Sequence, residues 1–153
     1  MRRLTIVWQR VVTPSGATCD RCGHTHAALQ RAVTRLKDVL RPLDLQPILE
    51  TVELTQGSFN RDPSASNRIW IAGRPLEEWL GARVGSSRCC SICGEAECRT
   101  VEIEETVFET IPEQLILRAA LVAAGRMIDP VTRMGASETE TCACEPACCA
   151  DGG

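Results

Sequence analysis

The chain has little aromatic content: no tyrosine, two phenylalanines and three tryptophans among 153 residues. Apolar residues still make up 44% of it, so the core must be built from Leu, Ile, Val and Ala. A chain of this length normally forms one domain around one core. The net charge is −3 and the arginines are scattered, so the basic face that binds nucleic acid is missing. We therefore expect a globular protein without a nucleic-acid partner.

Long hydrophobic runs are also missing. A membrane span needs about 20 apolar residues, whereas the longest run, residues 115–125, contains Arg118. The N-terminal segment is interrupted by Gln9 and Arg10, so it lacks the apolar stretch of a signal peptide. We expect a cytoplasmic protein without a membrane partner. In a reducing compartment, clustered cysteines are more often metal-binding or catalytic than disulfide-bonded.

Cysteine, by contrast, is abundant, and its ten residues fall into three clusters. The first is the pair Cys19-x-x-Cys22. The other two are a mid-chain group and a C-terminal group: Cys89, Cys90, Cys93 and Cys98; Cys142, Cys144, Cys148 and Cys149. Clustered thiols at such spacings bind soft metal ions or exchange disulfides. Because the sequence has no glycine-rich phosphate loop, we expect no organic cofactor.

The N-terminal half has the pattern of a βαβ unit. Residues 4–12 are rich in β-branched side chains and predict a strand, and residues 48–55 predict another. Between them, apolar residues recur at helical spacing from Leu29 to Leu40, and Pro42 ends this helix. The first cysteine pair therefore lies between a strand and a helix.

The second half is predicted from shorter signals. We expect a loop at 58–67, a strand at 68–72 and a short helix after Pro75, and residues 81–88 lead into the second cluster. Residues 100–109 alternate and predict a long strand or a hairpin folded near Glu105.

A final helix is predicted from Thr110-Ile-Pro-Glu113, a capping-box match, to about Met127. Residues 135–153 have no apolar side chain larger than Cys or Ala and cannot build a core. We expect a domain at 1–129 and a flexible, acidic, cysteine-rich tail at 130–153.

The first pair permits two kinds of chemistry. At a helix N-terminus the thiol pKa falls, so Cys19 would be the nucleophile of an oxidoreductase, Cys22 the resolving thiol and Arg21 a favourable nearby charge. Alternatively, C-x-x-C-G is a metal knuckle, and a second one at Cys90 and Cys93 would complete a four-cysteine site. In that case Thr25 would cap a helix that starts after the knuckle.

The mid-chain group is dense enough to bind an ion by itself. Adjacent Cys89 and Cys90 cannot easily ligate one ion together, so we favour Cys90, Cys93 and Cys98, with Cys89 outside this set or exchanging into it. Three thiolates suit zinc, mercury, arsenite or copper. A zinc-stapled loop with a purely structural role is the alternative. The tail cysteines would form an auxiliary soft-metal site, and His24 and His26 are weaker ligand candidates.

Four segments together resemble an uncharacterised bacterial and archaeal family, the domain of unknown function numbered 2703, over about residues 3–126. They are CDRCGHT, SNRIWIAGRPLEEWL, CC-x-x-CG-x-x-ECRTVE and ETIPEQLILRAAL. The resemblance implies a thioredoxin-like fold and thiol-dependent handling of mercury or arsenic. Thioredoxins place a cis-proline before their third strand, whereas this chain has Ser66-Asn67 there. This departure favours metal binding over disulfide exchange.

We thus expect an α/β, thioredoxin-like fold: a small mixed sheet flanked by helices, with a cysteine-rich insertion. Loops at strand C-termini converge, so Cys19, Cys22, Cys90, Cys93 and Cys98 should form one site. The leading hypothesis is a cytosolic protein that binds a soft metal or metalloid ion. The alternatives are a thiol–disulfide oxidoreductase, with a thiol-bearing protein as its partner, and a structural-zinc interaction module.

Overall fold

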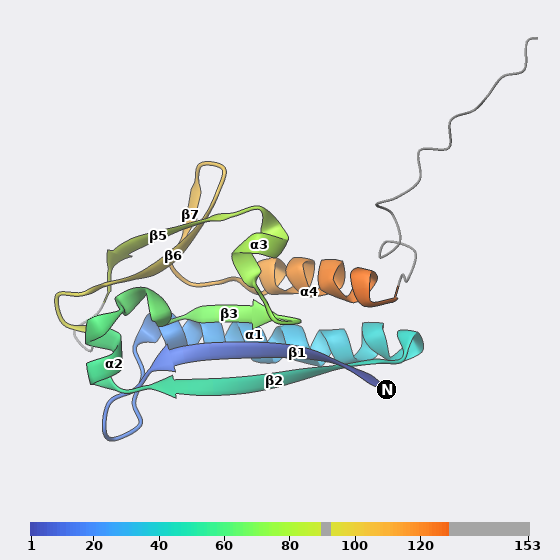
Figure 1. The fold of residues 1–153 in the computed structure, drawn as a ribbon, viewed down its shortest axis with the longest axis horizontal. Helices are drawn as coiled ribbons and strands as arrows, with labels where there is room; N and C mark the ends of the chain where they lie inside the picture. Colours follow the sequence, from blue (N-terminus) through green and yellow to red (C-terminus); the bar gives the residue numbers. More distant parts are fainter. Residues whose placement is uncertain (90–92, 129–153) are drawn as a thin grey trace, which may run out of the picture.

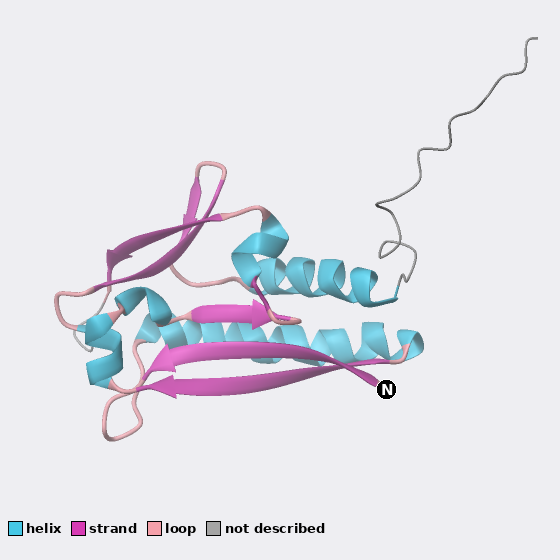
Figure 2. Ribbon diagram, in the orientation of Figure 1, coloured by secondary structure: helices cyan, strands magenta, loops and turns pink. Residues whose placement is uncertain are grey.

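The structure is a computed structural model that describes residues 1–89 and 93–128. It contains four α-helices, two 3-10 turns and seven strands within these ranges. Their order along the chain is β1 (Arg2–Val11), α1 (Asp20–Leu40), η1 (Arg41–Leu43), β2 (Leu45–Leu54), α2 (Gln56–Arg61), η2 (Pro63–Ala65), β3 (Arg68–Ile71), β4 (Arg74–Pro75), α3 (Leu76–Leu80), β5 (Arg83–Arg88), β6 (Glu97–Ile103), β7 (Thr106–Phe108) and α4 (Glu113–Ile128). Figure 2 shows helices and strands mixed throughout, so the fold is α/β.

Two sheets make up the β structure. The larger has the order β2-β1-β3-β4, in which β1 pairs parallel with β2 and antiparallel with β3. It is the mixed sheet that the sequence predicted, and β1, α1 and β2 form the predicted βαβ unit. The second sheet, β5-β6-β7, is antiparallel throughout. Figure 1 shows it at the end of the molecule where α1 begins, near the start of α4.

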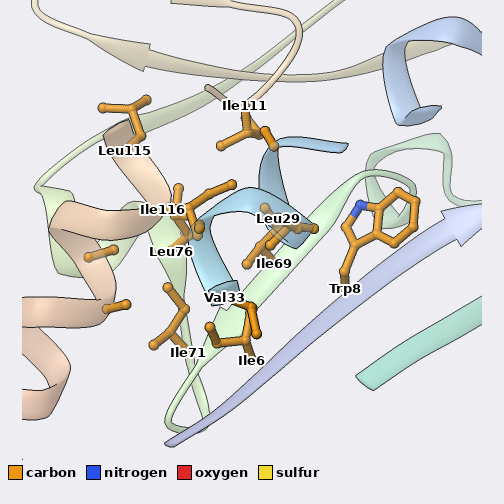
Figure 3. Packing of buried hydrophobic residues seen from close by; sticks show 14 of the residues in the cluster. Ile6, Trp8, Leu29, Val33, Ile69, Ile71, Leu76, Ile111, Leu115 and Ile116 are labelled. Carbon is orange, nitrogen blue, oxygen red and sulfur yellow. The ribbon is translucent and has the colours of Figure 1, made fainter. Parts of the chain in front are cut away.

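The core lies where α1 and α4 pack together and α1 packs on the larger sheet. Alternate residues of β1 (Leu4, Ile6 and Trp8) are completely buried, as the two-residue period of a strand requires. Figure 3 shows Trp8 and Ile6 on β1, with Leu29, Ile69 and Ile116 close by. The core is aliphatic as predicted, except that Trp8 and Phe59 are also fully buried. Among the described residues, no helix has the length and apolarity needed to cross a membrane.

The structure refines three segments between α1 and α4. The segment predicted as a loop at 58–67 overlaps α2, which Thr55 caps by accepting from Ser58 N–H (3.1 Å), and η2. The segment 81–88, for which no element was predicted, contains the strand β5. Of the two alternatives for 100–109 the hairpin is confirmed, and Glu104 adopts a positive φ of 54° at its turn.

Both predicted helix starts based on threonine are wrong. The final helix begins at Glu113. Its first carbonyl acceptor is that of Pro112, which accepts from Leu115 and Ile116 N–H, so the helix starts two residues later than a cap at Thr110 would place it. Likewise, α1 begins at Asp20, and Thr25 lies buried inside it, where its hydroxyl accepts from Ile111 N–H (3.2 Å). Thr25 thus uses its hydroxyl for a tertiary contact, and Glu113, the acidic member of the predicted capping box, pairs with Arg31 and Arg35 on α1.

Candidate metal centre

The first turn of α1 supplies two sulfurs of the site. Cys19 is the N-cap residue in extended conformation, and its carbonyl accepts from Gly23 N–H at 2.8 Å, as in a regular helix. Cys22 therefore lies one turn along the helix, and the separate C-x-x-C-G knuckle predicted as an alternative is wrong. Both residues are almost fully buried, with 1% and 2% of their surface exposed.

The β5–β6 hairpin supplies the other sulfurs. Cys89 follows directly after β5 and is half-buried, whereas Cys93 precedes β6 and is buried. Cys98 lies within β6, opposite Ser87 in the ladder, and is also buried. Cys90 and the four tail cysteines that the sequence proposed as ligands lie outside the described residues.

Three sulfurs from the two regions gather at one point. The Sγ atoms of Cys19, Cys89 and Cys93 all lie within 4.8 Å of one another, and those of Cys19 and Cys89 are 3.7 Å apart. A Zn–S bond of about 2.3 Å in tetrahedral geometry places neighbouring sulfurs about 3.8 Å apart. The three thiols are therefore close to the spacing that one soft ion needs. Two of the three sulfurs, those of Cys89 and Cys93, come from the mid-chain group. Cys89 was outside the ligand set predicted for that group, which was Cys90, Cys93 and Cys98.

Two further sulfurs flank the three. Cys98 accepts a hydrogen bond from Cys93 and donates one to Cys89. Cys22 accepts one from Cys19, and its sulfur lies 3.6 Å from the Ser66 hydroxyl oxygen. Ser66 Oγ accepts from Val11 N–H, which leaves the hydroxyl hydrogen available to the sulfur. The described part of the chain thus holds five thiol groups in one continuous cluster.

Hydrogen bonding and burial separate the acidities of these thiols. The Cys19 thiol donates to Cys22, which lowers the pKa of Cys22 and raises that of Cys19. Burial raises the pKa of Cys93, and burial also raises that of Cys98 to about 12. The more acidic member of the first pair is therefore Cys22, whereas the nucleophile predicted from the sequence was Cys19.

Arg21, between the two cysteines, has a different environment from the one predicted. Its guanidinium is buried and forms hydrogen bonds with Ser87, Arg88 and the Cys98 carbonyl, and an ion pair with Glu109. Its charge was expected to act on the thiols. No sequence signal marked Arg21 as a contact to the β5–β6 hairpin.

The two histidines do not join the sulfur group described above. His24 is exposed beside the groove between α1 and the start of α4. His26 stacks on Trp8, with ring centroids 4.8 Å apart, and burial lowers its pKa. Ser66, noted in the sequence because it replaces the cis-proline of thioredoxins, does lie at the site, with its hydroxyl against the Cys22 sulfur.

The fold and site define an α/β domain with a buried group of cysteines. Residues 4–120 match the family described as "Domain of unknown function (DUF2703)". An uncharacterised protein of Archaeoglobus fulgidus is 43% identical over 114 residues, which are 74% of this chain and 82% of that protein. The chain belongs to the DUF2703 family. No solved structure matches it.

Proposed function

We propose that the protein binds a soft metal or metalloid ion through Cys19, Cys89 and Cys93. The observation that carries this proposal is the approach of the three sulfurs to within 4.8 Å of one another. The ligands come from two regions seventy residues apart, so the fold itself assembles the set. Three thiolates without a nitrogen or carboxylate ligand in the group favour soft ions such as arsenite, Hg(II), Cu(I) or zinc.

Burial supports ion capture over exchange with protein disulfides. An oxidoreductase needs a thiolate that its substrate can reach. Cys22, the more acidic thiol of the first pair, is 2% exposed, and Cys19 is 1% exposed. Disulfide exchange by this pair is the second candidate function, and the lowered pKa of Cys22 is the observation that favours it.

The thioredoxin-like fold belongs to the same proposal. It is supported by the β2-β1-β3-β4 order and by a C-x-x-C pair at the start of α1. We also propose that residues 1–129 form the domain, that the tail cysteines form an auxiliary site and that the protein is cytoplasmic.

A titration of the reduced chain tests the function. The full chain carries C142S, C144S, C148S and C149S, so that only the proposed site and its neighbours remain. Arsenite, Hg(II), Cu(I) and Zn(II) are added under anaerobic conditions, and bound ion is counted per chain. We expect one ion per chain. Cys19→Ser or Cys93→Ser should weaken binding by more than about 100-fold, because each removes a ligand.

Two results would point elsewhere. One zinc per chain that arsenite and Hg(II) cannot displace identifies a structural zinc site. A chain that binds no ion but reduces a model disulfide, and loses this activity on Cys22→Ser, identifies the oxidoreductase.

A further inference from the structure

We propose that Arg21 is a positioning residue that holds the two halves of the thiol site together. It would do so by clamping the β5–β6 hairpin against the first turn of α1. This inference rests on the proposed function, because it concerns the assembly of the ligand set that α1 and the hairpin share.

The guanidinium reaches both strands of the hairpin at once. Nη2 donates to the Ser87 hydroxyl oxygen (3.0 Å) and to the Arg88 carbonyl oxygen (2.9 Å). Nη1 donates to the carbonyl oxygens of Cys98 (3.4 Å) and Ser87 (3.5 Å). The Glu109 carboxylate lies 3.4 Å away and also accepts from the Ser87 hydroxyl (2.8 Å). A single side chain of α1 thereby binds β5, β6 and the segment after β7.

These acceptors adjoin the sulfurs of the hairpin. Arg88 directly precedes Cys89, and Ser87 is the ladder partner of Cys98. On the helix side, Arg21 lies two residues after Cys19. The clamp therefore fixes backbone on both sides of the gap that the Cys19–Cys89 contact closes.

The chemistry of arginine suits this task. Its planar group has five N–H donors in a fixed fork, so it can satisfy several acceptors that diverge in direction. A lysine ammonium is a compact point charge and cannot hold the same set. With 7% of its surface exposed, Arg21 has little access to water in place of these partners. Ligands held ready before the ion arrives bind it more tightly than ligands that must first be ordered.

The first test needs no metal. The reduced full chain, with the four tail cysteines changed to serine, is treated with dibromobimane, which bridges neighbouring thiols. Peptide mapping then gives the ratio of Cys19–Cys89 to Cys19–Cys22 bridges. The second bridge joins cysteines three positions apart and serves as an internal reference. Unfolding would also favour this local bridge, so the mapping is done at a temperature at which circular dichroism shows each variant to be folded. We expect R21M to lower the ratio several-fold and R21K to give an intermediate value.

The matched control is R83M. Arg83 lies on the same strand, β5, but is exposed and pairs only loosely with Glu102 at 3.9 Å. Its replacement should leave the bridging ratio unchanged. A ratio equal to wild type in both R21M and R21K overturns the clamp. If R21M does not fold, R21K alone decides: a lowered ratio supports the proposal and an unchanged ratio overturns it.

The second test links the clamp to the ion. The dissociation constant of arsenite should rise by about 10–100-fold in R21M, the usual effect of losing an outer contact to a metal site. Phenylarsine oxide needs two thiols, which the helical pair supplies alone, so its binding should change much less. Arsenite affinity unchanged in R21M contradicts the proposal. If wild type binds no arsenite while R21M still lowers the bridging ratio, the clamp stands and the proposed function fails.

Discussion

The sulfur of Cys19 lies 3.7 Å from the sulfur of Cys89, although the two residues are 70 positions apart in the chain. One belongs to the N-cap of α1 and the other follows the last residue of β5. Closing so long a loop has an entropic cost, and packing of the hairpin against α1 must offset it. The contact makes the site a property of the tertiary fold.

Ion affinity should depend steeply on pH. The raised pKa values of Cys19 and Cys93 keep both thiols protonated at neutral pH, so a divalent ion must displace their protons. Release of at least these two protons makes the apparent zinc affinity rise at least about 100-fold per pH unit. Competition with a chromophoric zinc chelator between pH 6 and 8 measures the slope. An affinity that is flat over this range would show that the ligands are already thiolates.

The reduced, ion-free protein should lose stability in alkali. A cysteine in the unfolded chain ionises near pH 9.0, whereas burial holds the pKa of Cys98 at about 12 in the folded state. Above pH 9 the unfolded state has lost this proton and the folded state has kept it, so rising pH favours unfolding. The slope from one such thiol is about 1.4 kcal/mol per pH unit up to about pH 12.

Urea unfolding at pH 8, 9 and 10 tests this expectation. Cys98→Ala should reduce the alkaline slope relative to wild type, because it removes the titrating group from both states. Equal slopes in the two proteins would mean that Cys98 titrates normally in the fold.

The Trp8 indole should stabilise the fold through its hydrogen bond as well as through the volume that it fills in the core. Its Nε1 donates to Asn67 Oδ1 at 3.1 Å, and both residues are buried. Trp8→Phe leaves that oxygen without its partner, which costs about 1–3 kcal/mol of unfolding free energy. Chemical denaturation measures it. Trp70→Phe is the control, because Trp70 is half-buried under the Arg68 guanidinium, and it should cost less. Equal losses would contradict a specific role for the hydrogen bond.

Glu113 should stabilise the α1–α4 contact through charge. Its carboxylate pairs with Arg31 (3.1 Å) and Arg35 (2.6 Å), both largely exposed on α1. Glu113→Gln keeps the shape and removes the charge, so it should lower stability by up to about 1 kcal/mol at low salt and by less at high salt. Thermal unfolding at two ionic strengths measures this, with Glu78→Gln as a single-pair control. A loss that salt does not reduce would instead indicate a capping role.

Regular patterns made much of the fold predictable. The β-branched run of β1, the helical spacing of α1 and the proline that ends it were readable because each signal is local. The strand β5 was not, since its small and polar residues show no alternation and it forms by pairing with β6. Gly85 shows this dependence on the neighbouring strand. A Cβ at this position would lie 2.2 Å from the Glu102 carboxylate on β6, so the close approach of the two strands requires a glycine.

The site was predictable only in outline. Clustered cysteines indicated sulfur chemistry, and convergence of loops indicated that distant clusters meet. Which sulfurs meet depends on the hairpin register that sets Cys98 opposite Ser87, and on the reach of Arg21. Neither leaves a mark in the sequence. The lower pKa of Cys22 relative to Cys19 also depends on Ser66, a residue of the segment before β3 whose hydroxyl contacts the Cys22 sulfur.

The number of sulfur atoms around a bound ion tests the central claim most directly. Arsenic X-ray absorption is recorded on the arsenite-loaded full chain with its four tail cysteines changed to serine. The account predicts three sulfur neighbours, falling to two in Cys93→Ser and in Cys19→Ser. Three sulfur neighbours retained in both variants, or no sulfur-bound arsenic in the parent chain, would contradict it.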